Sequence, residues 1–201
     1  HVAAAEGHLP IVQLLLTSGA DVHAVSEDNR TPLTFAAVTN RTDVAALLLK
    51  SGAKADVATK YGLTALHYAV ANRTLEMVTE LLHDGTCVNI GTPAPLAVAL
   101  ALKEQAIALA LLNGGADPNW ELRDTEKELR LPGCGLRMQP HHKGYEGEQL
   151  TLEVMRGASI LQLCIYMASE AAVLAALERG ALIDGSTPPS NMAARPWTPL
   201  T

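Results

Sequence analysis

Three side chains between residues 134 and 142 could together hold a metal ion. Cys134 offers a thiolate, and His141 and His142 offer imidazole nitrogens, which are ligand types that zinc prefers. A closed zinc site needs a fourth ligand, but none stands at a recognisable spacing, and the chain has no C-x-x-C or H-x-x-x-H pair. The pattern therefore favours a chain without a metal site, and we expect no cofactor.

Acidic side chains recur at one place in the predicted helices. Asp43, Glu76 and Glu170 each stand near the start of a predicted second helix, where a carboxylate stabilises the positive end of the helix dipole. That role accounts for them without catalysis, which needs polar groups that converge in a cleft. The chain also contains no phosphate-binding G-x-x-x-x-G-K-S/T loop and no G-x-S-x-G nucleophile motif. We expect no enzymatic activity.

The three cysteines, Cys87, Cys134 and Cys164, form no paired motif. Cys164 occupies the small-residue position that Ala36 and Ala69 take in earlier parts of the chain, so we interpret it as a small buried hydrophobic residue. An odd number of cysteines without paired spacing is typical of a reducing, intracellular compartment.

The composition limits the classes of partner. Of the 201 residues, 48% are hydrophobic but only 3% are aromatic, so Ala and Leu must supply the core. The net charge of −6 argues against a surface for the phosphate backbone of nucleic acid, which needs a basic stripe. No apolar run approaches the ~18 residues of a membrane-spanning helix, and no signal peptide precedes the first predicted helix. We expect a cytoplasmic or nuclear protein without a nucleic-acid partner or a membrane span.

A fixed spacing organises these residues along the chain. Each of four leucines is followed 19 residues later by a glycine that can end a helix in the left-handed conformation. The pairs are Leu33 and Gly52, Leu66 and Gly85, Leu96 and Gly115, and Leu161 and Gly180. A spacing this strict predicts stacked helix pairs of constant length, because each pair must pack on both of its neighbours.

The connectors between the helix pairs differ in length instead. From each such glycine to the next leucine of the pattern, counted from Gly19 to Leu200, the chain runs 14, 14, 11, 46 and 20 residues. Doubling the length of a loop costs only about 0.6 kcal/mol of closure entropy, so connectors exposed to solvent can vary in this way. The longest connector contains residues 120–158, which lack the repeat pattern and which we interpret as an elongated finger.

Residues 61–89 contain one repeat in full. They begin with Gly62-Leu63-Thr64-Ala65-Leu66-His67, break at Asn72-Arg73-Thr74, and continue as an amphipathic segment that ends at Gly85. This stretch resembles the ankyrin repeat, whose pattern is G-x-T-P-L-H-x-A-A, a short turn, a V-x-x-L-L helix and G-A-D-V-N. The departures are Ala65 for the proline, Val70 for the second alanine, and Thr86-Cys87 for Ala-Asp.

The resemblance implies an all-α ankyrin-repeat solenoid, in which helix-turn-helix units stack and β-hairpin fingers project from one edge. It assigns residues 1–119 to a partial first unit and three further units, residues 120–158 to the insertion, and residues 159–201 to a fifth unit and the start of a sixth. It also implies that His67 bonds the backbone across a turn. Both ends of the sequence fall inside a unit, so we expect the chain to be part of a longer array.

Residues 95–102 are apolar on every face of the predicted first helix of unit four. A helix of this kind needs cover on all sides. The adjacent insertion is the nearest candidate for that cover, above all over Val98 and Leu102.

In ankyrin repeats, the fingers and the exposed side of each first helix line a concave groove that binds partner proteins. The resemblance therefore implies a protein partner, whose identity the residues leave open. A second hypothesis is that the repeats serve as the sensor or substrate-recruiting arm of a larger enzyme or signalling ATPase. Carried over by position, the expected contact residues are Glu27, Asp28, Arg30, Phe35, Val38, Thr39, Lys60, Tyr61, Leu63, Ala71, Asn72, Val98, Leu102, Tyr166 and Met167.

Overall fold

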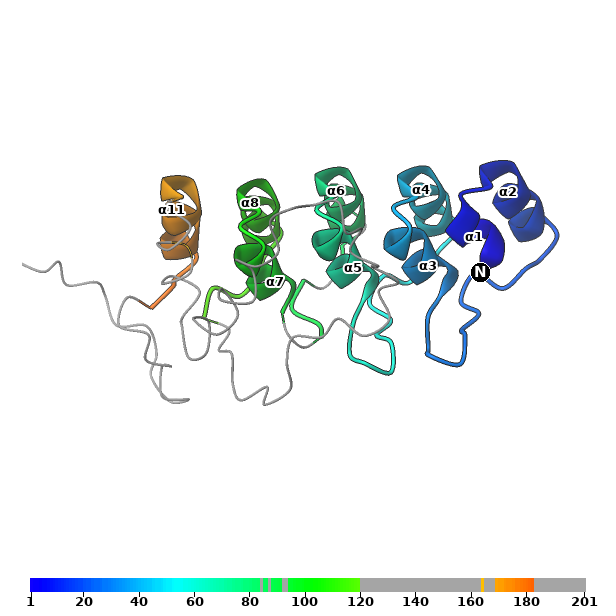
Figure 1. Ribbon diagram of the computed structural model, residues 1–201, viewed down its shortest axis with the longest axis horizontal. Coiled ribbons are helices and arrows are strands. Elements are labelled where there is room, and N and C mark those ends of the chain that lie inside the picture. Colours follow the sequence, from blue (N-terminus) through cyan, green and yellow to red (C-terminus); the bar gives the residue numbers. More distant parts are fainter. Residues whose placement is uncertain (84, 87, 92–93, 120–163, 165–168, 183–201) are drawn as a thin grey trace, which may run out of the picture.

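The chain folds as a stack of helix pairs (Figure 1). The computed structural model describes residues 1–83, 85–86, 88–91, 94–119, 164 and 169–182. Its helices are α1 (Val2–Glu6), α2 (Leu9–Thr17), α3 (Pro32–Val38), α4 (Thr42–Lys50), α5 (Ala65–Ala71), α6 (Leu75–His83), α7 (Pro95–Ala101), α8 (Gln105–Asn113) and α11 (Glu170–Glu178). The predicted all-α solenoid is confirmed over the part of the chain that the structure describes.

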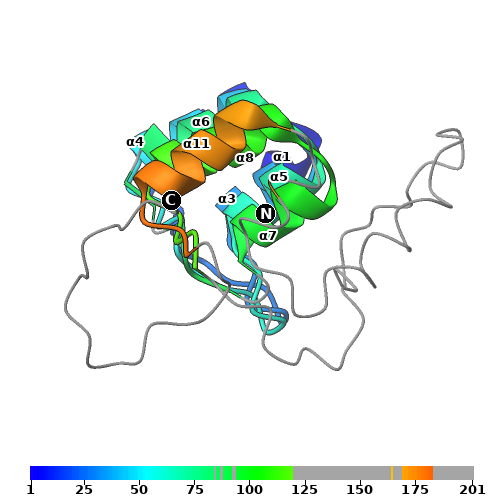
Figure 2. The same ribbon diagram turned by 90° about the vertical axis from the view of Figure 1, so that its left-hand side faces the viewer.

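The helices form two layers. The first helices of successive units, α1, α3, α5 and α7, pack side by side, and so do the second helices, α2, α4, α6, α8 and α11. The two helices of a unit also pack on each other in units one to four, which gives the end-on view its two-layered outline (Figure 2). None of the helices in the described ranges is long and apolar enough to cross a membrane.

Leucines and alanines at equivalent positions fill the space between the units. Leu33, Leu66 and Leu96 are at most 1% exposed, and Ala36, Ala69 and Ala99 are fully buried. Cys164 is buried in the same way, as predicted, and this burial raises the pKa of its thiol to about 11. A thiol with this pKa stays protonated at neutral pH, so Cys164 behaves as a packing residue.

Polar caps fix the first residue of the helices α3 and α5. Thr31 begins α3 by accepting a hydrogen bond at Oγ1 from Thr34 N, 3.2 Å away, and Pro32 stands at a position where its missing amide is not needed. In α5, Thr64 N donates to Nδ1 of His67 over 3.0 Å, and His67 is completely buried. The prediction that His67 bonds the backbone across a turn is therefore confirmed.

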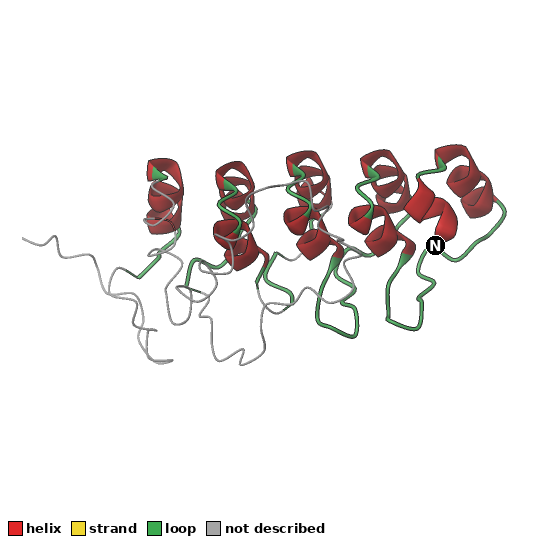
Figure 3. Cartoon of the chain, viewed as in Figure 1, coloured by secondary structure: helices red, strands yellow, loops and turns green. Residues whose placement is uncertain are grey.

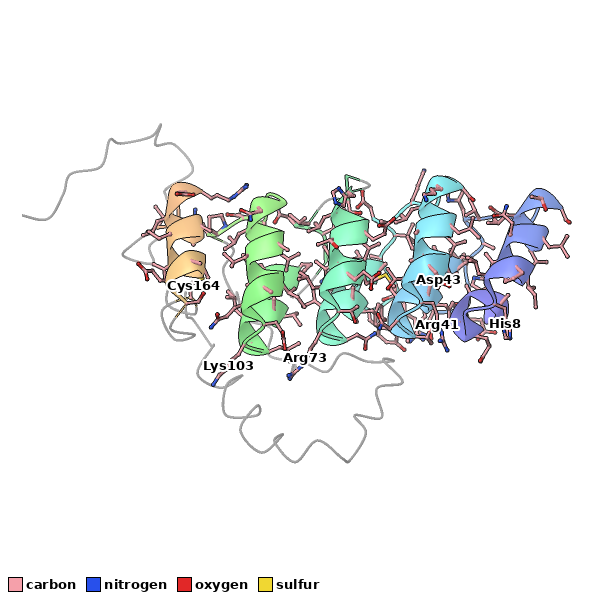
Figure 4. All side chains as sticks on the ribbon, turned by 90° about the horizontal axis from the view of Figure 1, so that it is seen from above. His8, Arg41, Asp43, Arg73, Lys103 and Cys164 are labelled. Carbon is pink, nitrogen blue, oxygen red and sulfur yellow. The ribbon has the colours of Figure 1, made fainter. Side chains whose placement is uncertain are left out.

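Cations and amides tie the end of the first helix of one unit to the following unit. Arg41 donates from Nε to the carbonyl of Ala5 over 3.4 Å, and Asn72 donates from Nδ2 to the carbonyls of Ala37 and Val38 over 2.9 and 3.0 Å. These carbonyls lie at helix C-termini, which need outside donors. Figure 4 shows His8, Arg41, Arg73 and Lys103 along this edge, where the two helices of each unit meet.

The connectors of units two and three differ from the β-hairpins that the resemblance implied. Finger two (residues 20–31) is closed by Asn29 N donating to Ser26 O over 2.9 Å and by Ser26 N donating to Arg30 O over 3.0 Å. Turns of this size leave no room for a ladder of pairs, and no strand is assigned within residues 1–83. The connector of unit three is closed in the same way, by Gly62 N donating to Thr59 O over 2.9 Å. Both connectors are therefore turn-closed loops, and they extend from the same side of the stack (Figure 3).

Candidate functional site

Fingers two and three are tied together at their tips. Finger three (residues 53–64) donates from Lys60 N to the carbonyl of Asp28 over 3.0 Å. In return, Asn29 of finger two donates from Nδ2 to the carbonyl of Ala58 over 2.5 Å. The ammonium of Lys60 also forms an ion pair with the carboxylate of Asp28. These three interactions, which we call the finger lock, hold the two tips at one separation.

The ion pair of the finger lock shifts the pKa values of its two side chains in opposite directions. The hydrogen bond from Lys60 lowers the pKa of Asp28, and the same bond raises the pKa of Lys60. Both side chains are charged across the neutral range, and the pair is lost as pH falls through the lowered pKa of Asp28. Because solvent reaches both groups, the ion pair adds little to the stability of the fold, and its main effect is to orient the two finger tips.

Tyr61 is the aromatic side chain that the finger lock positions. It is 41% exposed, and the ammonium of Lys60 lies 5.2 Å from the centre of its ring. Its backbone N donates to Oγ1 of Thr59 over 3.3 Å, and Thr59 is buried. Because a turn anchors its backbone and a cation lies beside its ring, Tyr61 should lose little conformational entropy when it binds a partner.

A second aromatic side chain, Phe35, lies on the exposed side of α3. The guanidinium of Arg30 lies 5.9 Å from the centre of its ring, and the ring of His1 meets it edge to face at 5.3 Å between ring centres. Phe35 is half-buried in this arrangement. It is therefore a partly accessible ring that is bordered by the cation of Arg30 and by the ring of His1.

Other predicted contact residues remain accessible beside these rings. Glu27 and Thr39 are exposed, and Val38, Ala71 and Leu102 are partly exposed. With the rings and the charged pair of the finger lock, they are the predicted contact residues on the fingers and first helices that stay accessible. We call this set the finger surface, and its members are Glu27, Asp28, Arg30, Phe35, Val38, Thr39, Lys60, Tyr61, Ala71 and Leu102.

Three of the predicted contact residues are used by the fold instead. Leu63 is 2% exposed, and its carbonyl accepts a hydrogen bond from Thr59 N over 2.8 Å. Val98 is 1% exposed, because α7 is buried along its whole length against α5, α8 and their surroundings. The side-chain amide of Asn72 donates hydrogen bonds to the carbonyls at the end of α3. The positions of Leu63 and Val98 correct the expectation that they face a partner.

The remaining candidates lie outside the described residues. These are the contact residues Tyr166 and Met167, the possible metal ligands Cys134, His141 and His142, and the insertion at residues 120–158 with its expected cover over the unit-four helix. Within the described ranges, no group of three His, Cys, Asp or Glu side chains could hold a metal ion.

Two residues of the finger surface region were missed by position matching. His1 borders Phe35 and also bonds the carbonyl of Ala24 through Nε2 at 2.9 Å. Asn29 supplies one bond of the finger lock and has a φ of 60°, which asparagine tolerates better than most residues. The residue types in Glu27-Asp28-Asn29 are typical of a turn, but a bond to a neighbouring finger has no signature within one repeat.

Comparison with known proteins supports the repeat assignment for the first part of the chain. Residues 1–92 match the family described as ankyrin repeats (3 copies). Domains of this family generally mediate protein–protein interaction and are typically non-catalytic. No curated protein matches the chain.

Proposed function

Residues 1–92 belong to the ankyrin-repeat family, and on this premise we propose that the chain binds a partner protein through the finger surface. The observation that carries the proposal is Tyr61, an exposed aromatic ring at the tip of a finger that is locked to its neighbour. Aromatic side chains at preorganised positions commonly dominate interface energetics. The turn-closed fingers also keep the tip away from the packed core.

The charges of the finger surface favour a protein over a nucleic acid. Its cations Arg30 and Lys60 are matched by the carboxylates of Glu27 and Asp28, so the surface presents no basic stripe. A balanced surface with two accessible rings is typical of protein interfaces, which enrich aromatic residues and Arg. The free, buried thiol of Cys164 is in keeping with a reducing compartment, so we place the protein inside the cell.

Two variants, each of which replaces one exposed lysine by alanine, test this proposal. Lys60→Ala removes the ion pair of the finger lock and the cation beside Tyr61, so we expect the Kd for a purified partner to rise about fivefold, or ~1 kcal/mol. Lys50→Ala removes an exposed lysine from the last turn of α4 and should leave the Kd unchanged. The partner is first captured with the full chain, and both variants are then titrated against it by calorimetry. A loss of affinity in Lys50→Ala alone would place the interface on the second-helix layer.

A further inference from the structure

An asparagine joins unit three to unit four by two hydrogen bonds. Asn89 donates from Nδ2 to the carbonyl of Gly115 over 3.3 Å, and its Oδ1 accepts from Asp117 N over 2.9 Å. Gly115 is the glycine that ends α8, and Asp117 follows two residues later. One side-chain amide thus pairs with the backbone on both sides of the next turn, which fixes the relative position of the two units.

The same two bonds recur between unit four and the helix α11. Asn119 donates from Nδ2 to the carbonyl of Gly180 over 2.9 Å, and its Oδ1 accepts from Leu182 N over 2.8 Å. Gly180 follows α11 as Gly115 follows α8, and Leu182 again stands two residues later. In sequence, however, Asn119 is separated from these partners by 61 and 63 residues, compared with 26 and 28 for Asn89.

Other contacts of α11 repeat those of the earlier second helices. Ser169 N donates to Cys164 O over 3.5 Å, just as Thr74 N donates to Ala69 O over 3.2 Å in unit three. The helix packs on α8, and Arg179 donates from a guanidinium nitrogen to the carbonyl of Asn113 over 2.9 Å. This bond satisfies a carbonyl at the end of α8, which the helix itself leaves open.

We infer that the array continues past the matched residues 1–92 as two further ankyrin units, one at residues 94–119 and one that contains residues 164–182, and that Asn119 carries the register between them. The long connector between these units does not interrupt the stack, because the bonds of Asn119 match those of Asn89 atom for atom. Over the residues that the structure describes, the array open to a partner therefore includes at least part of five units, whichever surface a partner uses. This inference does not rest on the finger surface.

Hydrogen exchange of the full 201-residue chain, followed by mass spectrometry, tests the role of Asn119. In the wild type, the amides of α11 should be protected. Asn119→Ala removes both hydrogen bonds to the backbone around Gly180, and we expect exchange in α11 to rise about tenfold while exchange in α3 and α4 stays unchanged. Asn119→Asp keeps the acceptor for Leu182 N but loses the donor to Gly180, so its effect should be intermediate.

Asn113→Ala is the matched control, because it shortens an exposed asparagine at the end of α8 and leaves the carbonyl that Arg179 uses in place. Exchange in α11 should then stay at the wild-type rate. An unprotected α11 in the wild type would contradict the inference, as would equal rates in Asn119→Ala and the wild type. Loss of protection throughout the stack in Asn119→Ala would show that this residue has no local role.

Discussion

Gly91→Ala should lower the free energy of unfolding by about 3 kcal/mol, because the new methyl group has no space and the backbone is left-handed at this position. Gly91 has a φ of 99°, and a Cβ there would lie 2.3 Å from Cε1 of His67 and 2.5 Å from the carbonyl oxygen of Gly62. Hydrogen bonds hold both neighbours in place, so moving either one costs free energy. His67 is held by its bond from Thr64 N, and Gly62 closes the turn of finger three.

Gly52→Ala is the control that separates strain from crowding. Gly52 has a φ of 87°, but a Cβ there would meet no atom within 4 Å. This variant should therefore lose only about 1 kcal/mol, the typical cost of a left-handed conformation for a residue with a side chain. Urea denaturation monitored by circular dichroism measures both variants. Equal losses would contradict the close approach of the unit-four connector to His67.

Tyr61→Ala should weaken binding of the partner about thirtyfold, which corresponds to ~2 kcal/mol. The ring is exposed, so its removal takes nothing from the core, and thermal stability should stay within the range of other surface changes. Tyr61→Phe keeps the ring and the contact with the ammonium of Lys60, so its Kd should stay close to that of the wild type. Titration of the purified partner by calorimetry gives both values.

Leu75→Ala is the matched control for exposed apolar area. Leu75 is 40% exposed, nearly the same as Tyr61, but it begins α6 in the layer of second helices. Its truncation should not change the Kd. If Leu75→Ala weakens binding as much as Tyr61→Ala does, contact with general apolar surface explains the affinity, and the finger surface has no special role.

The helix pairs of this protein could be predicted from sequence because their signals lie within each repeat. The 19-residue spacing from Leu33 to Gly52 recurs wherever a pair must fit between two neighbours, and caps such as Thr31 mark helix starts directly. The burial of Cys164 followed from its equivalence to alanines in other units. Residues that obey the repeat are thus predictable from their position in it.

The finger surface was less predictable, because it depends on contacts between units. The position of Leu63 in the repeat predicted an exposed contact residue, but its side chain is buried. Val98 and Phe35 were both predicted as contact residues, although the former is buried and the latter is half-buried beside Arg30. Exposure at one repeat position changes with the neighbouring units, and no pattern within a single repeat encodes it.

Hydrogen exchange of the complex with its partner tests the central claim, that binding occurs through the fingers, most directly. The amides of residues 21–30 and 54–63 should exchange more slowly in the complex, because these segments carry the finger lock and Tyr61. Amides of the second helices α4 and α6 should exchange at the rate of the free chain. Protection confined to α4 and α6, with both fingers unchanged, would contradict binding through the finger surface.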